Sequence, residues 1–345
     1  MLPSLKEQIM LQPAPILDTP NKPTRSVRPQ AANTAAWLFT VFLTVVVALA
    51  SNADAAEYKR TIRNGPNTII LPQDAEETKR LFGDGYQYLN RDHLVFISDL
   101  DQQTLVRLAL QDFQTYLVML TRQLFTKALN SHRQGNSEIP TVFLFKDRDS
   151  YVRGLQAMGI SAAMGSGSES GNLRNGYHFS APGVSFILIN YHENYAFGLS
   201  IFAHELTHAL VRMEYPTAPI WLNEGLATMF ENCKVEGGQL RYAFSSSLVR
   251  MQRSLRSGNA LPLARLFKST NRDFSASDHL PYYDAAELLC RYLHSRNLLI
   301  PVYLEMREGR SMGENGSETV ARIAGGTLEN LEKNWHEWLK SQQRR

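Results

Sequence analysis

The feature that most constrains the fold is the run HELTHALVRMEYPTAPIWLNEGLA (204–227), where two helical patterns meet at a pair of prolines. The apolar residues of its first half and of the turn before it recur at helical spacing: Ile201, Phe202, Leu206, Ala209, Leu210 and Met213. This spacing predicts a helix with a buried face. Pro216 and Pro219 end that helix. The sequence therefore predicts two consecutive helices, over 198–214 and 220–232, joined by a bend.

Two histidines and a glutamate open this run. Positions i and i+4 of a helix lie on one face, so His204 and His208 can direct both imidazoles at one metal ion. Glu205 lies one residue further round the helix, where it can take a proton from a water activated by the metal. Polar groups on a buried helix cost free energy unless a partner satisfies them, and a metal does so directly. We predict a metal site with Glu205 as general base.

A catalytic zinc takes three protein ligands and keeps one position open. Glu224 lies early in the second predicted helix, and a helical hairpin can fold its carboxylate back over the two histidines. The alternative for Glu224 is a glutamate on a solvent-facing side of the helix. Its position after the bend favours the role of third ligand.

HELTH followed by WLNEGLA resembles the gluzincin zinc peptidases, and is most similar to the bacterial peptidase MA-like families. The resemblance implies that zinc is the cofactor and that His204, His208 and Glu224 are its ligands. It implies that Glu205 is the catalytic base. It also implies an α+β fold of the zincin type, with a small mixed β-sheet before a mostly helical C-terminal half. The specific part of the resemblance covers 204–227.

The same resemblance implies two further roles, and the position of Glu231 suggests a third. Related enzymes use a tyrosine or histidine of a later helix to stabilise the oxyanion, which maps onto Tyr283, although Tyr283, like Tyr282, is alternatively a packed aromatic. Enzymes of this clan align an extended peptide on an exposed edge strand. SFILIN (185–190) is the candidate, but its continuous apolar run is equally typical of an interior strand. Glu231, two turns beyond Glu224, either orients a ligand histidine or lies at the surface.

The residues before the motif predict a small α/β unit over 93–158. It consists of a strand over 93–99, a helix from Gln102 to Leu129 that Asp99 or Asp101 can cap, a strand over 140–147 and a further helix. A Gly/Ser-rich loop over 159–176 and a hairpin over 177–190 come next. From 198 onward the sequence predicts an almost wholly helical chain. Beyond the two motif helices, helices are expected over 244–256, 282–296, 299–308 and 327–341.

The N-terminus has the parts of an export signal. A basic segment precedes AAWLFTVFLTVVVALA (35–50), and small residues that offer A-x-A cleavage sites follow it. Because this apolar run is shorter than the about 20 residues that span a bilayer, we predict a cleaved signal peptide with an extended n-region over 1–56. An uncleaved membrane anchor is the alternative. The remainder is divided into an α/β part of the catalytic domain (57–160) and a zinc-binding, helical part (161–345).

Charge and cysteine content narrow the function classes. The formal net charge is +3, and the body of the chain has no dense Lys/Arg run, which argues against a nucleic-acid partner. With 345 residues, 43% of them hydrophobic, the chain can build a core without a disulfide framework. Cys233 and Cys290 either form a disulfide after export or remain buried thiols.

These features together predict a bacterial zinc metallopeptidase, periplasmic or secreted, that acts on a peptide or protein substrate. If the N-terminal segment is uncleaved, the protein is anchored to the membrane and faces the periplasm. One alternative is an envelope protein that keeps the metal and the fold without turnover, and Glu205 argues against it. Another is a structural envelope protein without metal, which leaves the histidine helix unexplained.

Overall fold

The computed structural model of the chain describes residues 61–64, 67–91, 94–125, 140–158, 160, 175–181, 184–191, 195–236, 239–242 and 245–342. These residues belong to one compact unit, 43–345. The predicted signal segment and most of the predicted Gly/Ser-rich loop lie outside the described residues. Among the described residues, no helix is both long and apolar enough to cross a membrane. The predicted mixed α+β fold class is confirmed, whereas the domain boundary at 160 stays a prediction.

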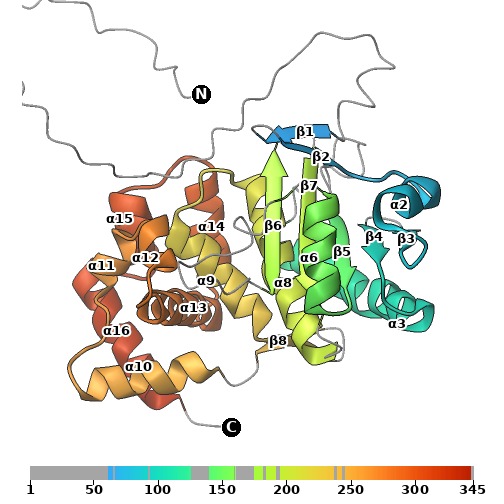
Figure 1. The fold of residues 1–345 in the computed structure, drawn as a ribbon. Helices are drawn as coiled ribbons and strands as arrows, with labels where there is room; N and C mark the ends of the chain where they lie inside the picture. The colour runs from blue at the N-terminus through green and yellow to red at the C-terminus, as the bar shows by residue number, and fades with distance from the viewer. Residues whose placement is uncertain are drawn as a thin grey trace, which may run out of the picture. The chain divides into compact units, whose positions relative to one another are not determined.

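A five-stranded sheet forms the N-terminal part (Figure 1). Its strands, in spatial order, are β3 (Gln87–Arg91), β4 (Leu94–Ser98), β5 (Thr141–Phe145), β7 (Val184–Asn190) and β6 (Gly176–Ala181). β4, β5 and β7 are parallel, and β3 and β6 run antiparallel at the two edges. The strands predicted over 93–99 and 140–147 and the hairpin over 177–190 are confirmed.

The candidate edge strand, 185–190, is an interior strand. It belongs to β7, which pairs with β5 on one side and with β6 on the other. Its continuous apolar run has a physical cause, because both faces of an interior strand are covered by other elements. The edge strand next to the histidine motif is β6, so the expectation of an edge at 185–190 is wrong.

The side chains of β5 alternate between two apolar clusters. Val142 and Leu144 belong to a large cluster, together with residues of α3 (Gln102–Arg107), α4 (Gln114–Gln123), α8 (Tyr195–Glu214), α9 (Ile220–Glu231) and α13 (Leu280–Ser295). Phe143 and Phe145 belong to a smaller cluster with residues of α6 (Arg148–Ala157). This alternation is the period-two pattern of a strand that is covered on both faces. The sheet therefore separates α8 from α6.

Aspartate side chains cap two of the helices around the sheet. The Asp101 side chain accepts a hydrogen bond from the Thr104 N–H at 2.9 Å and caps α3. Asp147 caps α6 and accepts from the Ser150 N–H at 2.7 Å. The helix predicted from Gln102 continues from α3 through a π-helical segment, η1 (Leu108–Phe113), into α4.

The C-terminal half is helical, as predicted, with one addition. The four helices predicted beyond the motif are α10 (Ser246–Arg256), α13, α14 (Leu299–Arg307) and α16 (Leu328–Ser341). The addition is a two-stranded hairpin of β8 (Cys233–Glu236) and β9 (Gln239–Tyr242). The remaining elements that the sequence did not predict are short: β1 (Thr61–Asn64), β2 (Asn67–Ile70), α2 (Ala75–Phe82), β3, α11 (Leu263–Phe267), α12 (Asn271–Ser275), η2 (Glu314–Gly316) and α15 (Ser317–Ile323). Cys233 and Cys290 are buried free thiols.

Candidate metal centre

The two motif helices, α8 and α9, pack against each other across a proline-containing bend. Pro219 precedes the first residue of α9, where the absence of an N–H breaks no helical hydrogen bond. Its carbonyl accepts from the N–H groups of Leu222 and Asn223, both at 3.0 Å. The predicted helix, bend and helix are therefore confirmed, and the bend brings the start of α9 back beside α8.

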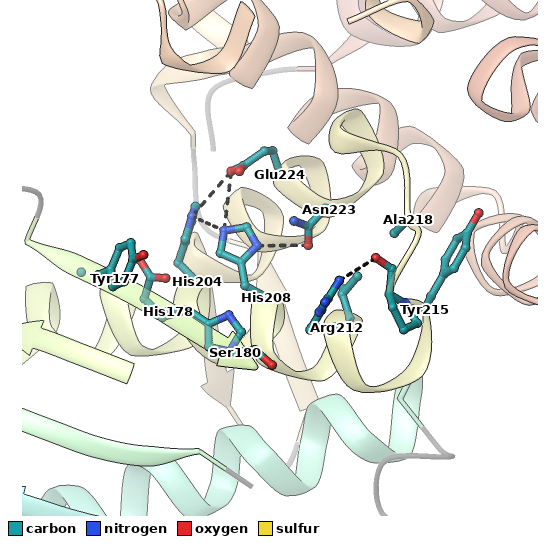
Figure 2. Close-up of a pocket in the computed structure, with 14 residues that line it drawn as sticks. Tyr177, His178, Ser180, His204, His208, Arg212, Tyr215, Ala218, Asn223 and Glu224 are labelled. Carbon is teal, nitrogen blue, oxygen red and sulfur yellow. Dashed lines mark hydrogen bonds and ion pairs between the residues drawn. The ribbon is translucent and has the colours of Figure 1, made fainter. Parts of the chain in front are cut away.

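His204 and His208 from α8 and Glu224 from α9 point toward one another (Figure 2). The two histidine Nε2 atoms lie 3.0 Å apart. Oε2 of Glu224 lies 3.8 Å from Nε2 of His204 and 3.6 Å from Nε2 of His208. A point equidistant from these three atoms is about 2.0 Å from each, close to the usual length of a zinc–nitrogen or zinc–oxygen bond. The three residues form a group that could hold a metal ion.

Glu224 gives an independent reason to expect a cation here. Its side chain is only 12% exposed, and its Oε2 atom is buried with no hydrogen-bond partner among the described residues. A buried carboxylate oxygen without a partner costs free energy, and most such atoms in proteins are satisfied. A divalent cation between the imidazoles would satisfy it. The donor set therefore fits a metal.

The far side of each imidazole is held by an acceptor. Nδ1 of His204 lies 2.9 Å from Oε2 of Glu231, and Nδ1 of His208 lies 3.0 Å from Oδ1 of Asn223. Both acceptors require a proton on Nδ1, so each Nε2 atom can present a lone pair to a metal. Such outer partners are the usual supports of metal-binding histidines. Of the two alternatives for Glu231, the orienting contact is the one observed.

These contacts also set the charge of the metal-free site. Burial lowers the pKa of His204, but the hydrogen bond that its Nδ1–H donates to Glu231 and the charges of Glu205, Glu231 and Glu224 outweigh burial and raise the pKa to about 9. Without a metal, His204 is therefore protonated at neutral pH, and its Nε2–H can donate to Nε2 of His208. A metal must displace this proton when it binds.

A cavity of about 350 Å³ lies over the three residues. Glu205 lines the same cavity and is 9% exposed. Its position depends on Gly176 of β6, because a Cβ atom there would lie 2.8 Å from Oε1 of Glu205 and 2.4 Å from Cγ2 of Ile201. Only glycine allows the edge strand to approach α8 so closely. The remaining lining residues are Tyr177, His178, Ser180, Val211, Arg212, Tyr215, Pro216, Ala218 and Asn223.

Tyr283, the predicted oxyanion donor, is not among the described residues that line this cavity. Its ring packs edge-on against the rings of Phe274, at 5.0 Å, and His279, at 5.6 Å. This is the packed aromatic that the sequence left open as the alternative. The catalytic role of Tyr283 stays a prediction without support from its position.

Two residues of the site were not predicted from the sequence. Asn223 lies directly before Glu224, and its position beside a predicted ligand was the available signal. His178 lines the cavity from β6, and its Nε2 lies 3.1 Å from Oγ of Ser185. Burial and the charges of His208 and Arg212 lower the pKa of His178 to about 3, so it is neutral. The two-residue alternation of a strand, once β6 is known to be the edge, would have identified it.

Two further residues of the WLNEG segment (221–225) fix the position of α9. Trp221 is fully buried, and its Nε1–H donates to the carbonyl of Asn315 at 3.0 Å. Gly225 lies against α13, where a Cβ atom would be 2.7 Å from the carbonyl oxygen of Ala286. These two contacts fix the helix on either side of Glu224, so the carboxylate is positioned by packing on the C-terminal half.

Comparisons with protein family models and with curated proteins do not identify the site. No protein family model matches the chain, and no curated protein matches it. The resemblance to gluzincin peptidases therefore depends on HELTH and WLNEGLA, and it stays a prediction.

Proposed function

We propose that the protein is an exported zinc metallopeptidase that hydrolyses peptide bonds in the cavity over His204, His208 and Glu224. The observation that carries the proposal is the convergence of these three side chains beside Glu205 in one cavity. Two imidazoles and one carboxylate are a ligand set of catalytic zinc, which keeps a position open for chemistry. Export is proposed from the apolar segment 35–50 alone.

Each residue of the site has a part in this reaction. A zinc ion, when bound, lowers the pKa of water and polarises a carbonyl group. Glu205 accepts the proton of the attacking water on its carboxylate and passes it to the leaving amine. Glu231 and Asn223 keep the protons of the two imidazoles on Nδ1, so that Nε2 remains available to the metal.

The substrate would enter along β6. Among the described strands, β6 pairs only with β7 and so leaves its outer edge open, and it contributes four residues to the wall of the cavity. An extended peptide can add to such an edge through main-chain hydrogen bonds. β6 therefore replaces 185–190 as the proposed docking strand.

The test combines zinc analysis with cleavage of a peptide library by the wild type and by Glu205→Gln. Both proteins are expected to retain zinc, while the variant loses about 10²–10⁴-fold in cleavage rate because it lacks the base. Glu329→Gln, an exposed glutamate of α16, is the matched control and should cleave like the wild type. A wild type without zinc would refute the proposal. Zinc binding without cleavage of any peptide would favour the alternative of a metal-binding protein without turnover.

A further inference from the structure

We propose that Arg212 binds a carboxylate of the peptide substrate and makes the cavity selective for acidic peptides. The inference rests on the proposed peptidase function and adds a substrate class to it. It starts from one observation: Arg212 is the single lysine or arginine among the described residues that line the cavity.

Arg212 continues the line of the two histidines along α8. His204, His208 and Arg212 follow one another at intervals of four residues, so their side chains lie on one face of the helix. Arg212 is about 6 Å further along the helix axis than His208. One residue of extended peptide spans about 3.4 Å, so this rise along the helix corresponds to about two substrate residues.

Arg212 is exposed and has no carboxylate partner among the described residues. Its Nη1–H donates to the carbonyl of Pro216 at 3.1 Å, in the bend between α8 and α9 (Figure 2). By contrast, Arg250, Arg291 and Arg307 each pair with a carboxylate of the chain, at 2.6, 3.3 and 2.7 Å. The hydrogen bond to Pro216 is the one that the described residues give Arg212, and a guanidinium has five N–H donors. Donors therefore remain for a ligand in the cavity.

A carboxylate is the ligand that suits these donors. Arginine binds a carboxylate through two parallel N–H···O bonds, which gives both strength and direction. Because Arg212 is positioned by a backbone carbonyl rather than neutralised by an acid, it brings a full positive charge to this end of the cavity. In a peptide, the carboxylate comes from an aspartate or glutamate side chain or from a free C-terminus.

The direction of β6 indicates where in the substrate the carboxylate lies. Gly176, at the start of β6, faces Ile201 and Glu205. His178, further along β6, is close enough to His208 and Arg212 for their charges to lower its pKa. β6 and α8 therefore run in the same direction. A peptide that adds antiparallel to β6, the commoner mode of pairing, passes Arg212 before it reaches Glu205. This order places an acidic side chain about two residues before the scissile bond.

The experiment uses a zinc-loaded protein and matched peptides that carry Glu or Gln two residues before the cleaved bond, each with a free or an amidated C-terminus. The wild type is expected to prefer Glu over Gln by about 10-fold in kcat/KM. In Arg212→Gln this ratio should fall to about one with the zinc content unchanged, and Arg212→Glu should reverse it, so that the Gln peptide is preferred over the Glu peptide. Arg253→Gln, an exposed arginine of α10 outside the cavity, should keep the ratio of the wild type.

A wild type that does not distinguish Glu from Gln or free from amidated peptides, or an Arg212→Gln variant that keeps the preference, would overturn the inference. A preference for the free C-terminus that Arg212→Gln abolishes would support carboxylate binding by Arg212, but it would overturn the antiparallel direction, because a C-terminal carboxylate lies after the scissile bond. Failure of the peptidase proposal is distinguishable, because binding of the same peptides can be measured by calorimetry on zinc-loaded Glu205→Gln with and without Arg212→Gln. Equal affinity for the Glu and Gln peptides in that measurement would also overturn it.

Discussion

Two groups of buried carboxylates in this molecule differ in how they are satisfied. Between α10 and α13, Asp284 is 4% exposed and Glu287 is fully buried. Both oxygens of Asp284 accept from Arg250, at 2.6 and 2.8 Å, and those of Glu287 accept from Ser245 and Arg291. Between α8 and α9, Oε2 of Glu224 is buried and has no hydrogen-bond partner among the described residues.

The difference separates a structural cluster from a binding site. The α10–α13 group is complete within the chain, so its charges need nothing further. The group of His204, His208 and Glu224 brings two imidazoles together with a carboxylate oxygen that has no hydrogen-bond partner among the described residues, and these three ligand atoms could hold a metal ion. Buried polar groups that a protein leaves unsatisfied call for an explanation in terms of function.

The largest expected effect is on the complete cluster. Glu287→Ala should lower the free energy of unfolding by about 3 kcal/mol, because it removes the partner of Arg291, whose side chain is only 18% exposed. Its metal affinity should equal that of the wild type. Denaturant unfolding and a metal titration measure the two quantities. A stability unchanged by this substitution would contradict the structural role of the cluster.

Glu224→Gln should have the opposite pattern, with its main effect on metal binding instead of on stability. It should weaken metal binding by more than about 100-fold, beyond the range that is typical of outer partners. It should lower the stability of the metal-free protein by less than Glu287→Ala does, because Oε2 of Glu224 has no hydrogen-bond partner to lose among the described residues. The same two measurements apply. A large loss of stability in the metal-free variant would show that Glu224 belongs to the structural class.

Outer partners should have a smaller effect than ligands. Glu231→Gln and Asn223→Ala should each weaken metal binding by about 10–100-fold, because each removes or weakens the acceptor that orients an imidazole. Competition with a chelating dye measures the change. Wild-type affinity in both variants would mean that the histidines are positioned by packing alone.

Within one pH unit, the change of metal affinity with pH should be the smallest effect. Because the pKa of His204 is raised from 6.5 to about 9 in the metal-free protein, a metal must displace its proton below pH 9. Metal affinity should rise by up to about tenfold per pH unit between pH 7 and 9 and level off above that. In the metal-free protein, the stabilisation from protonated His204 is fully present below pH 6.5 and lost as the pH rises through 9. An affinity that is flat over this range would contradict the raised pKa.

Much of the site was predictable because its geometry is local. His204 and His208 share a helix face by periodicity, and two prolines and a buried tryptophan bring Glu224 back over them. The edge strand was not predictable from the sequence. Whether 185–190 or 176–181 forms the edge depends on the order of the strands in the sheet, which decides the strands that each of them pairs with. Tyr283 fails to reach the cavity for a related reason, since its place depends on how α13 packs against its neighbours.

The proposed function requires that His204, His208 and Glu224 hold one zinc ion. The most direct test removes metal with a chelator, adds zinc, and measures the bound metal by mass spectrometry in the wild type, His204→Ala and Glu224→Ala, with Glu287→Ala as a control. We expect one zinc ion per chain in the wild type and the control, and none in the two ligand variants. A wild type without zinc, or ligand variants that retain it, would contradict the account.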